Sequence, residues 1–151
     1  LIAEGVDVLE RALRRARPGP YQVQAAIAAV HADAPNADAT DWAQIAALYA
    51  TLAQLDRSPV VTVNRAVAVA RADGPHAGLR LLAPLDGDER RARYQPLHAA
   101  RAELLQEAGD LEAARAAYRR ALELTDNARE RSALRRRAGP LAPGDAGRPR
   151  A

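Results

Sequence analysis

Residues 102–124 constrain the fold of this chain more than any other segment, because they form two apolar-striped helical patterns joined by a single turn. Gly109 and Asp110 form that predicted turn. Small residues on both helices would let the two helices approach closely, and Tyr118 would fill the space towards the next pair. The small residues are Ala102, Ala114 and Ala121. The segment therefore predicts a close-packed antiparallel helix pair.

The spacing of similar residues indicates that this pair is one unit of a repeat. The positions that match two periods apart, at a distance of 69 residues (118 − 49 and 124 − 55), are Tyr49 with Tyr118 and Leu55 with Leu124. Gly74 and Gly109 are 35 residues apart (109 − 74), which is one period. Tetratricopeptide repeats are about 34 residues long and have this helix–turn–helix layout. We therefore expect an all-α chain of about eight helices, in antiparallel pairs that stack as a right-handed solenoid.

The composition agrees with close-packed helices. Hydrophobic residues make up 48% of the chain but aromatic residues only 3%, and Phe, Met and Cys are absent, so Ala, Leu, Val and Ile must build the core. Without cysteine there is no disulfide, thiol nucleophile or Cys-ligated zinc, and a reducing cytoplasm is the expected compartment. No apolar run approaches the roughly 20 residues of a membrane span, and no signal peptide is visible.

Caps and breakers divide the chain into predicted elements. Helical patterns are expected at 1–17, 21–32, 41–55, 60–71, 75–84, within 94–124, and at 127–137. Asp41 with Gln44 and Asn127 with Glu130 form capping patterns, and Ser58 is expected to cap the helix at 60–71. The β-branched run at 60–63 would suit a strand, but the repeat register favours a helix there. We divide the chain into an N-terminal helical part (1–56), two repeats with a capping helix (57–138) and a disordered Pro/Gly-rich tail (139–151).

Charge is unevenly distributed along the chain. All 22 basic residues are Arg, and the net charge is +3. Residues 90–151 hold 14 Arg and 8 acids (+6), whereas residues 1–89 hold 8 Arg and 11 acids (−3). A basic C-terminal third is one mark of nucleic-acid binding. A solvated helix face is the favoured interpretation, because acids interleave the arginines as far as Glu130.

Several blocks of sequence are more specific than a general repeat. They are RALRRARPGPYQVQAAIAAVHADAP (11–35), TDWAQIAALYATL (40–52), SPVVTVNRAVAVA (58–70), GPHAGLRLL (74–82), YQPLHAARAELLQEAGDLEAARAAYRRALEL (94–124) and NARERSALRRR (127–137). This succession resembles the C-terminal half of bacterial extracytoplasmic-function sigma factors that carry a tetratricopeptide-like extension. The resemblance covers about residues 1–137. Two departures from the repeat pattern are Asp126, where Pro is common, and Ala102, where Gly is common.

The resemblance implies a role in transcription initiation. The parent protein would bind core RNA polymerase and promoter DNA through two helical domains that are absent from this chain. This chain would be the interaction or regulatory region, with RNA polymerase or the sigma domains of its parent as partner and no specific DNA binding of its own. The family offers no catalytic residue, cofactor or metal to carry over. The chain begins at Leu1 rather than Met, so we expect it to be a piece of a longer protein.

Four polar residues are candidates for partner binding. Asn64 falls on the first helix of its pair, whose side chains would line the concave groove of a solenoid. Arg71, Glu103 and Gln106 project in the same register and could anchor a peptide through hydrogen bonds. Alternatively, Asn64 and its neighbour Arg65 fix helix packing, by bonding to backbone or by pairing with Asp41 or Glu103. Trp42 and Tyr49 continue an apolar stripe and are expected in the core.

No pattern in the sequence indicates catalysis. The histidines at 31, 76 and 98 lack ligand spacing, and the segment 74–78 is too rich in Pro for a phosphate loop. Neither serine lies in a nucleophile-elbow context. Two functions therefore remain open, the extension of a sigma factor and a free-standing repeat scaffold that binds an unrelated protein.

Overall fold

The computed structural model describes residues 19–142, in which all regular structure is helical. Eight α-helices occur in this range: α2 (Pro20–Asp33), α3 (Trp42–Leu55), α4 (Pro59–Asp73), α5 (Pro75–Leu82), α6 (Glu89–Ala92), α7 (Gln95–Ala108), α8 (Leu111–Glu123) and α9 (Ala128–Ala138). Three 3-10 turns accompany them: η1 (Ala37–Ala39), η2 (Ala83–Gly87) and η3 (Gly139–Leu141). The predicted all-α class and helix number are confirmed, as is the helix over residues 60–63. The helix predicted at 1–17 lies outside the described residues.

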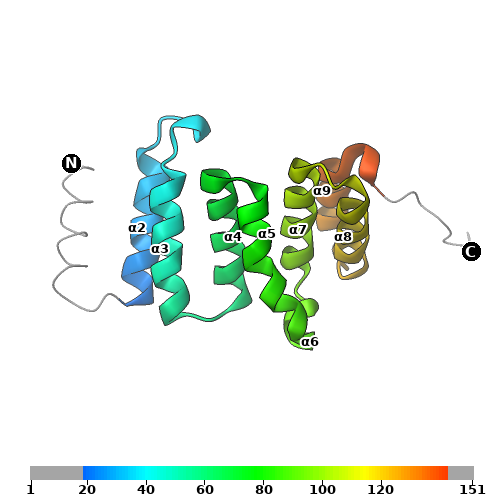
Figure 1. Ribbon diagram of the computed structural model, residues 1–151, viewed down its shortest axis with the longest axis horizontal. Coiled ribbons are helices and arrows are strands. Elements are labelled where there is room, and N and C mark those ends of the chain that lie inside the picture. The colour runs from blue at the N-terminus through cyan, green and yellow to red at the C-terminus, as the bar shows by residue number, and fades with distance from the viewer. Residues whose placement is uncertain (1–18, 143–151) are drawn as a thin grey trace, which may run out of the picture.

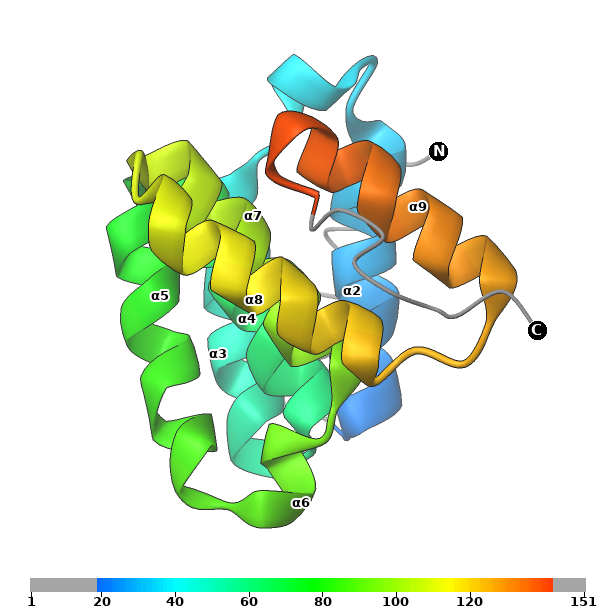
Figure 2. The same ribbon diagram turned by 90° about the vertical axis from the view of Figure 1, so that its right-hand side faces the viewer.

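The helices stand side by side along the long axis of the molecule (Figure 1). The most extensive contacts join α3 to α4, α4 to α5 and α7 to α8, and α7 also contacts α4 and α5. Figure 2 shows α9 on the opposite side of α7 and α8 from α5. Each helix thus packs mainly on its neighbours in the chain. The solenoid arrangement and its right-handed sense stay predictions.

Helix ends follow from glycine, aspartate and asparagine. Gly74 (φ 95°) ends α4 and Gly109 (φ 87°) ends α7, in the left-handed half of backbone space where glycine is favoured. Asp110 then accepts from the backbone N–H of Ala113 at 3.1 Å and caps α8. Asp41 likewise caps α3, and Asn127 caps α9. Ser58 occupies the N-cap position of α4, as expected, but its side chain makes no cap hydrogen bond.

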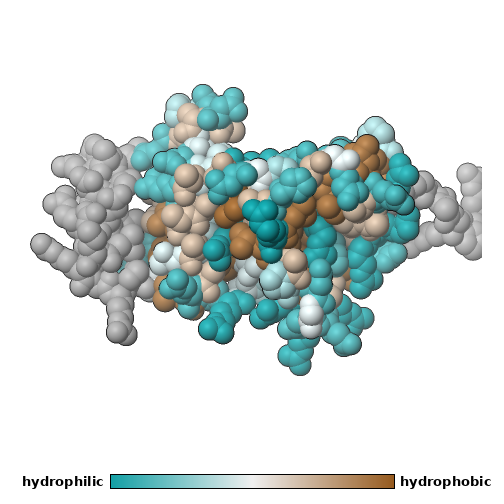
Figure 3. Space-filling model, viewed as in Figure 1, coloured by the Kyte–Doolittle hydropathy of each residue, from teal (hydrophilic) through white to brown (hydrophobic). Residues whose placement is uncertain are grey.

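Apolar side chains form clusters between successive helices. One cluster joins α2 and α3 to Val61 and Ala68 of α4, across the expected boundary between residues 56 and 57. Others join α4, α5 and α7, and then α7, α8 and α9. On the face turned to the viewer in Figure 3, apolar atoms also reach the surface over the middle of the row. Successive clusters along the row therefore share a helix, α4 or α7.

The residues expected to pack the repeat differ in how deeply they are buried. Four of them are fully buried between α7 and α8, namely Ala102, Ala114, Tyr118 and Ala121. Tyr49 and Leu124 are half-buried. The packing role predicted for Leu55 is wrong: this residue is the last of α3 and is 46% exposed.

The glycine that permits close helix packing is Gly78, which the repeat spacing did not single out. A Cβ on Gly78 would lie 2.5 Å from the carbonyl oxygen of Ala66 and 2.8 Å from the Cβ of Ala70. Around Gly74 no atom lies within 4 Å of such a Cβ. Gly74 and Gly109 share a spacing because both end the first helix of a pair.

The prediction of disorder from residue 139 onward is wrong for residues 139–142. Gly139–Leu141 form a 3-10 turn, and Leu141 is buried against Ala102, Ala114 and Tyr118. A single leucine in a Pro/Gly-rich segment thus finds an apolar surface already formed by α7 and α8. Residues 143–151 lie outside the described range.

Candidate functional site

Two adjoining hollows lie along α7. The first, of about 430 Å³, is lined by Glu103, Gln106, Glu107, Tyr118 and Arg137. The second, of about 330 Å³, lies between α4, α7 and α9 and is lined by Val67, Gln95, Pro96, Ala99, Ala100, Glu103, Glu130, Ala133, Leu134 and Arg137. Because Glu103 and Arg137 line both hollows, we treat them as one surface and call it the α7 groove.

Three polar contacts tie the neighbouring helices to α7 along the groove. Arg71 of α4 donates to Glu107 at 2.8 Å, and the side chains of Arg137 on α9 and Glu103 form an ion pair at 3.1 Å. Tyr118 of α8 donates its hydroxyl hydrogen to Gln106 at 3.0 Å. Ion pairs this exposed each stabilise a fold by only about 0–1 kcal/mol. The ion pairs along the polar wall of the groove can therefore open and re-form at little cost in free energy.

The surroundings of the Tyr118 hydroxyl change its pKa. Burial raises the pKa of Tyr118 above its ordinary value, and the nearby Glu103 carboxylate raises it further. Arg137 opposes this shift. The tyrosine therefore stays a neutral hydrogen-bond donor to Gln106 at physiological pH.

The floor of the second hollow is apolar and built from small side chains. Ala99 and Ala100 of α7, Val67 of α4 and Ala133 and Leu134 of α9 line it. Alanines leave room above the helix backbone that a larger side chain would fill. Such a surface can receive an apolar side chain of another molecule, whereas the polar wall beside it can fix that molecule's orientation.

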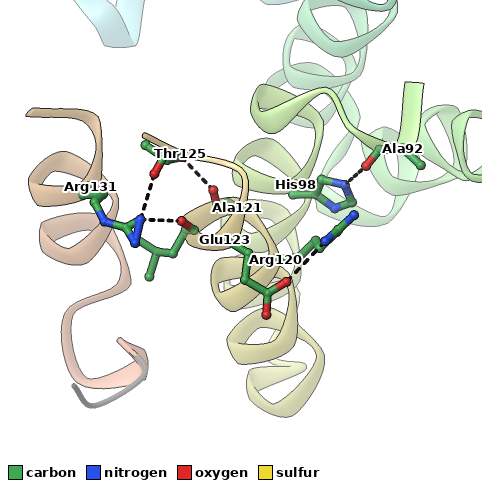
Figure 4. A network of polar contacts seen from close by, with 8 residues as sticks. Ala92, His98, Arg120, Ala121, Glu123, Thr125 and Arg131 are labelled. Atoms are coloured by element: carbon green, nitrogen blue, oxygen red, sulfur yellow. Dashed lines mark hydrogen bonds and ion pairs between the residues drawn. The ribbon is translucent and has the colours of Figure 1, made fainter. Parts of the chain in front are cut away.

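Helix α9 is held against α8 by hydrogen bonds to the end of α8 (Figure 4). Arg131 donates through Nη1 to the carbonyl oxygens of Leu122 and Thr125, each at 2.7 Å. The Thr125 hydroxyl in turn donates to the carbonyl oxygen of Ala121 at 2.7 Å. Leu134 completes the attachment by packing on Ala121 and Leu122. These contacts fix the wall of the groove that carries Glu130 and Arg137.

A buried histidine fixes the start of α7. The Nε2 atom of His98 lies 2.6 Å from the carbonyl oxygen of Ala92, the last residue of α6 (Figure 4). This contact joins the short helix α6 to α7. It explains His98 as a structural residue.

The structure brings together three of the four residues predicted for partner binding. Glu103 and Gln106 line the groove, and Arg71 reaches its edge through Glu107. Asn64 is exposed two turns before Arg71 on α4 and does not line either hollow. It hydrogen-bonds to the Tyr49 side chain, which opposes the increase that burial causes in the pKa of Tyr49.

The pairings considered for Arg65 do not form. Asp41 caps α3 and Glu103 pairs with Arg137, and the Nε atom of Arg65 is buried with no hydrogen-bond partner among residues 19–142. The alternative that Arg65 fixes helix packing through a hydrogen bond is therefore not supported.

Sequence reasoning missed the groove residues Val67, Glu107, Glu130 and Arg137. The spacing 103, 106, 107 on one helix face was visible in the sequence, and could have added Glu107. Arg137 lies 34 residues after Glu103 (137 − 103), so their pairing depends on how α9 turns back after α8. No local sequence pattern predicts the direction in which α9 turns back.

Other kinds of site were sought in the same residues. Within the described range, no group of three His, Cys, Asp or Glu residues is placed to hold a metal ion. None of the helices between residues 19 and 142 has both the length and the apolar character needed to cross a membrane.

Comparison with known proteins finds a relative of greater length. The chain is 45% identical over 142 residues to an uncharacterized protein of Rhizobium meliloti (strain 1021). The match covers 94% of this chain and 33% of that protein, so the chain spans about a third of the relative's length. The chain matches no protein-family model. It matches no solved structure either.

Proposed function

We propose that this chain is the C-terminal interaction and regulatory region of an extracytoplasmic-function sigma factor, acting in the cytoplasm in transcription initiation. The succession of sequence blocks between residues 11 and 137 supports the assignment, because it resembles that group of proteins. The match to one third of a longer relative fits a region that works beside other domains.

The observation that carries the interaction role is the α7 groove. It combines an apolar floor with hydrogen-bonding groups in a wall of weak, exposed contacts, which is the usual composition of a protein-binding surface. The partner would be RNA polymerase or the promoter-binding domains of the same parent protein. Promoter sequence would be read by those domains, and this chain would bind DNA only through non-specific phosphate contacts that weaken steeply with salt.

Run-off transcription with the complete parent protein and core RNA polymerase tests the proposal. Ala133→Arg, at a partly exposed position of the groove floor, places a long cation there and should reduce initiation from the parent's promoter. Ala116→Arg, on an exposed position of α8, is the matched control and should leave initiation unchanged. Initiation that survives both Ala133→Arg and deletion of residues 19–142 would exclude a role in transcription and leave the free-standing scaffold as the better proposal.

A further inference from the structure

The lining of the α7 groove is acidic, although the segment of sequence that supplies most of it is basic. Its two hollows are lined by three carboxylates, Glu103, Glu107 and Glu130, and by the single cation Arg137, which gives a net charge of −2 (1 − 3). Residues 90–151 carry 14 Arg and 8 acids, or +6. An acidic hollow favours cationic ligands.

We propose that the α7 groove binds a basic segment of a protein partner, with one apolar side chain on the floor formed by Val67, Ala133 and Leu134. A Lys or Arg of that segment contacts the carboxylates of Glu103 and Glu130. This inference rests on the proposed function only in taking the groove as the partner-binding surface. What it adds is the chemical nature of the bound segment, which is basic with one apolar side chain.

Arg137 is the internal competitor of this ligand. Its ion pair with Glu103 spans the two hollows at 3.1 Å, and the two side chains are 58% and 32% exposed, so water screens the pair and little free energy opposes its opening. A cation of the partner can therefore take the place of Arg137 on Glu103.

Glu130 is the second carboxylate that contacts the partner's cation, and no internal cation has to be displaced from it first. It lies in the first turn of α9, on the rim of the apolar floor, and its carboxylate has no ion-pair partner among residues 19–142. Glu107, by contrast, is already held by Arg71 at 2.8 Å. The two hollows thus offer one unpaired carboxylate and one that is exchangeable, and both lie beside the apolar floor.

Fluorescence anisotropy with the full chain and two labelled synthetic peptides tests the inference. The peptides share one amphipathic, leucine-containing sequence and carry either arginine or glutamate at every polar position. The arginine peptide should bind and the glutamate peptide should not. Glu103→Gln and Glu130→Gln should each raise the Kd for the arginine peptide about two- to five-fold, as expected for the loss of one exposed ionic contact. Arg137→Gln should lower the Kd by a similar factor.

Glu112→Gln is the matched control, because Glu112 is an exposed glutamate in the first turn of α8, as Glu130 is in α9, but lies outside the groove. It should leave the Kd unchanged. Weaker binding by Arg137→Gln, equal affinity for the two peptides, a preference for the glutamate peptide, or no binding of either would each overturn the inference. Because no polymerase or promoter is present, such a failure leaves the proposed role in transcription to be judged by the run-off assay.

Discussion

Replacing Gly78 by alanine tests the packing of α5 on α4 most sharply. The added methyl would lie 2.5 Å from the carbonyl oxygen of Ala66, and 2.8 Å from both the Cβ of Ala70 and the Cδ1 of Leu104. The Ala66 oxygen is a backbone atom of α4, and the Ala70 Cβ is bonded directly to that backbone, so side-chain rotation can move neither atom away. The helices must separate, and overpacking of this kind costs about 1–3 kcal/mol.

Alanine also stabilises a helix interior by about 1 kcal/mol relative to glycine. With contacts this short, the packing cost should lie near the top of its range, which leaves a net loss of about 1–2 kcal/mol in the free energy of unfolding. For a domain of this size, the melting temperature should fall by about 2–8 °C. The shift in the urea midpoint at constant slope measures the loss.

Gly87→Ala is the control for this experiment. No atom lies within 4 Å of a Cβ at Gly87, and its backbone does not require glycine. That variant should be as stable as the natural chain, or more stable by up to about 1 kcal/mol. If Gly78→Ala behaves like Gly87→Ala, the close approach of α5 to α4 is absent and the reasoning fails.

Three further changes probe other parts of the structure. Ala121→Leu should lower the free energy of unfolding by about 1–3 kcal/mol, because the alanine is fully buried between helices; an unchanged denaturation midpoint would place it at the surface. Arg65→Met should be neutral or stabilising, because it removes a buried donor without a partner, and a loss above about 1 kcal/mol in a urea titration would reveal a bond to Arg65. Tyr118→Phe should cost about 1 kcal/mol below pH 10 through its lost bond to Gln106. The pKa of Tyr118 is 10.0 in the unfolded chain and higher in the folded one, so the natural chain should lose stability as the pH rises from 10.0 through the folded-state pKa. The Tyr118→Phe variant should lose less stability over the same pH range. Equal losses for the two proteins would contradict the pKa shift.

Helix positions were largely predictable because their causes are local. An aspartate or asparagine marks the start of α3, α8 and α9, and a glycine marks the end of α4 and α9. The short helix α6 was missed because four residues hold barely one turn, too few to show a helical period. The burial of Leu141 was missed for a different reason. Its Pro/Gly-rich sequence neighbours give no information about the apolar surface of α7 and α8 on which it packs.

The candidate site was predictable only in part. Glu103 and Gln106 could be placed on one face of a helix from their spacing alone. The role of Gly78 could not, because a glycine needed for close packing looks like any other glycine until the opposing helix is known. Arg137 likewise contacts Glu103 only through the angle at which α9 returns to α7, which is set by the tertiary contacts of Arg131 and Leu134.

Site-specific photocrosslinking in the complete parent protein, assembled with core RNA polymerase, tests the central claim most directly. A photoreactive amino acid at Ala133, on the groove floor, is compared with one at Ala116, on an exposed position of α8. The account predicts that Ala133 crosslinks to a basic segment of the polymerase or of the parent's promoter-binding domains, and that Ala116 does not. Crosslinks that are equal at both positions, or absent from Ala133, would contradict it.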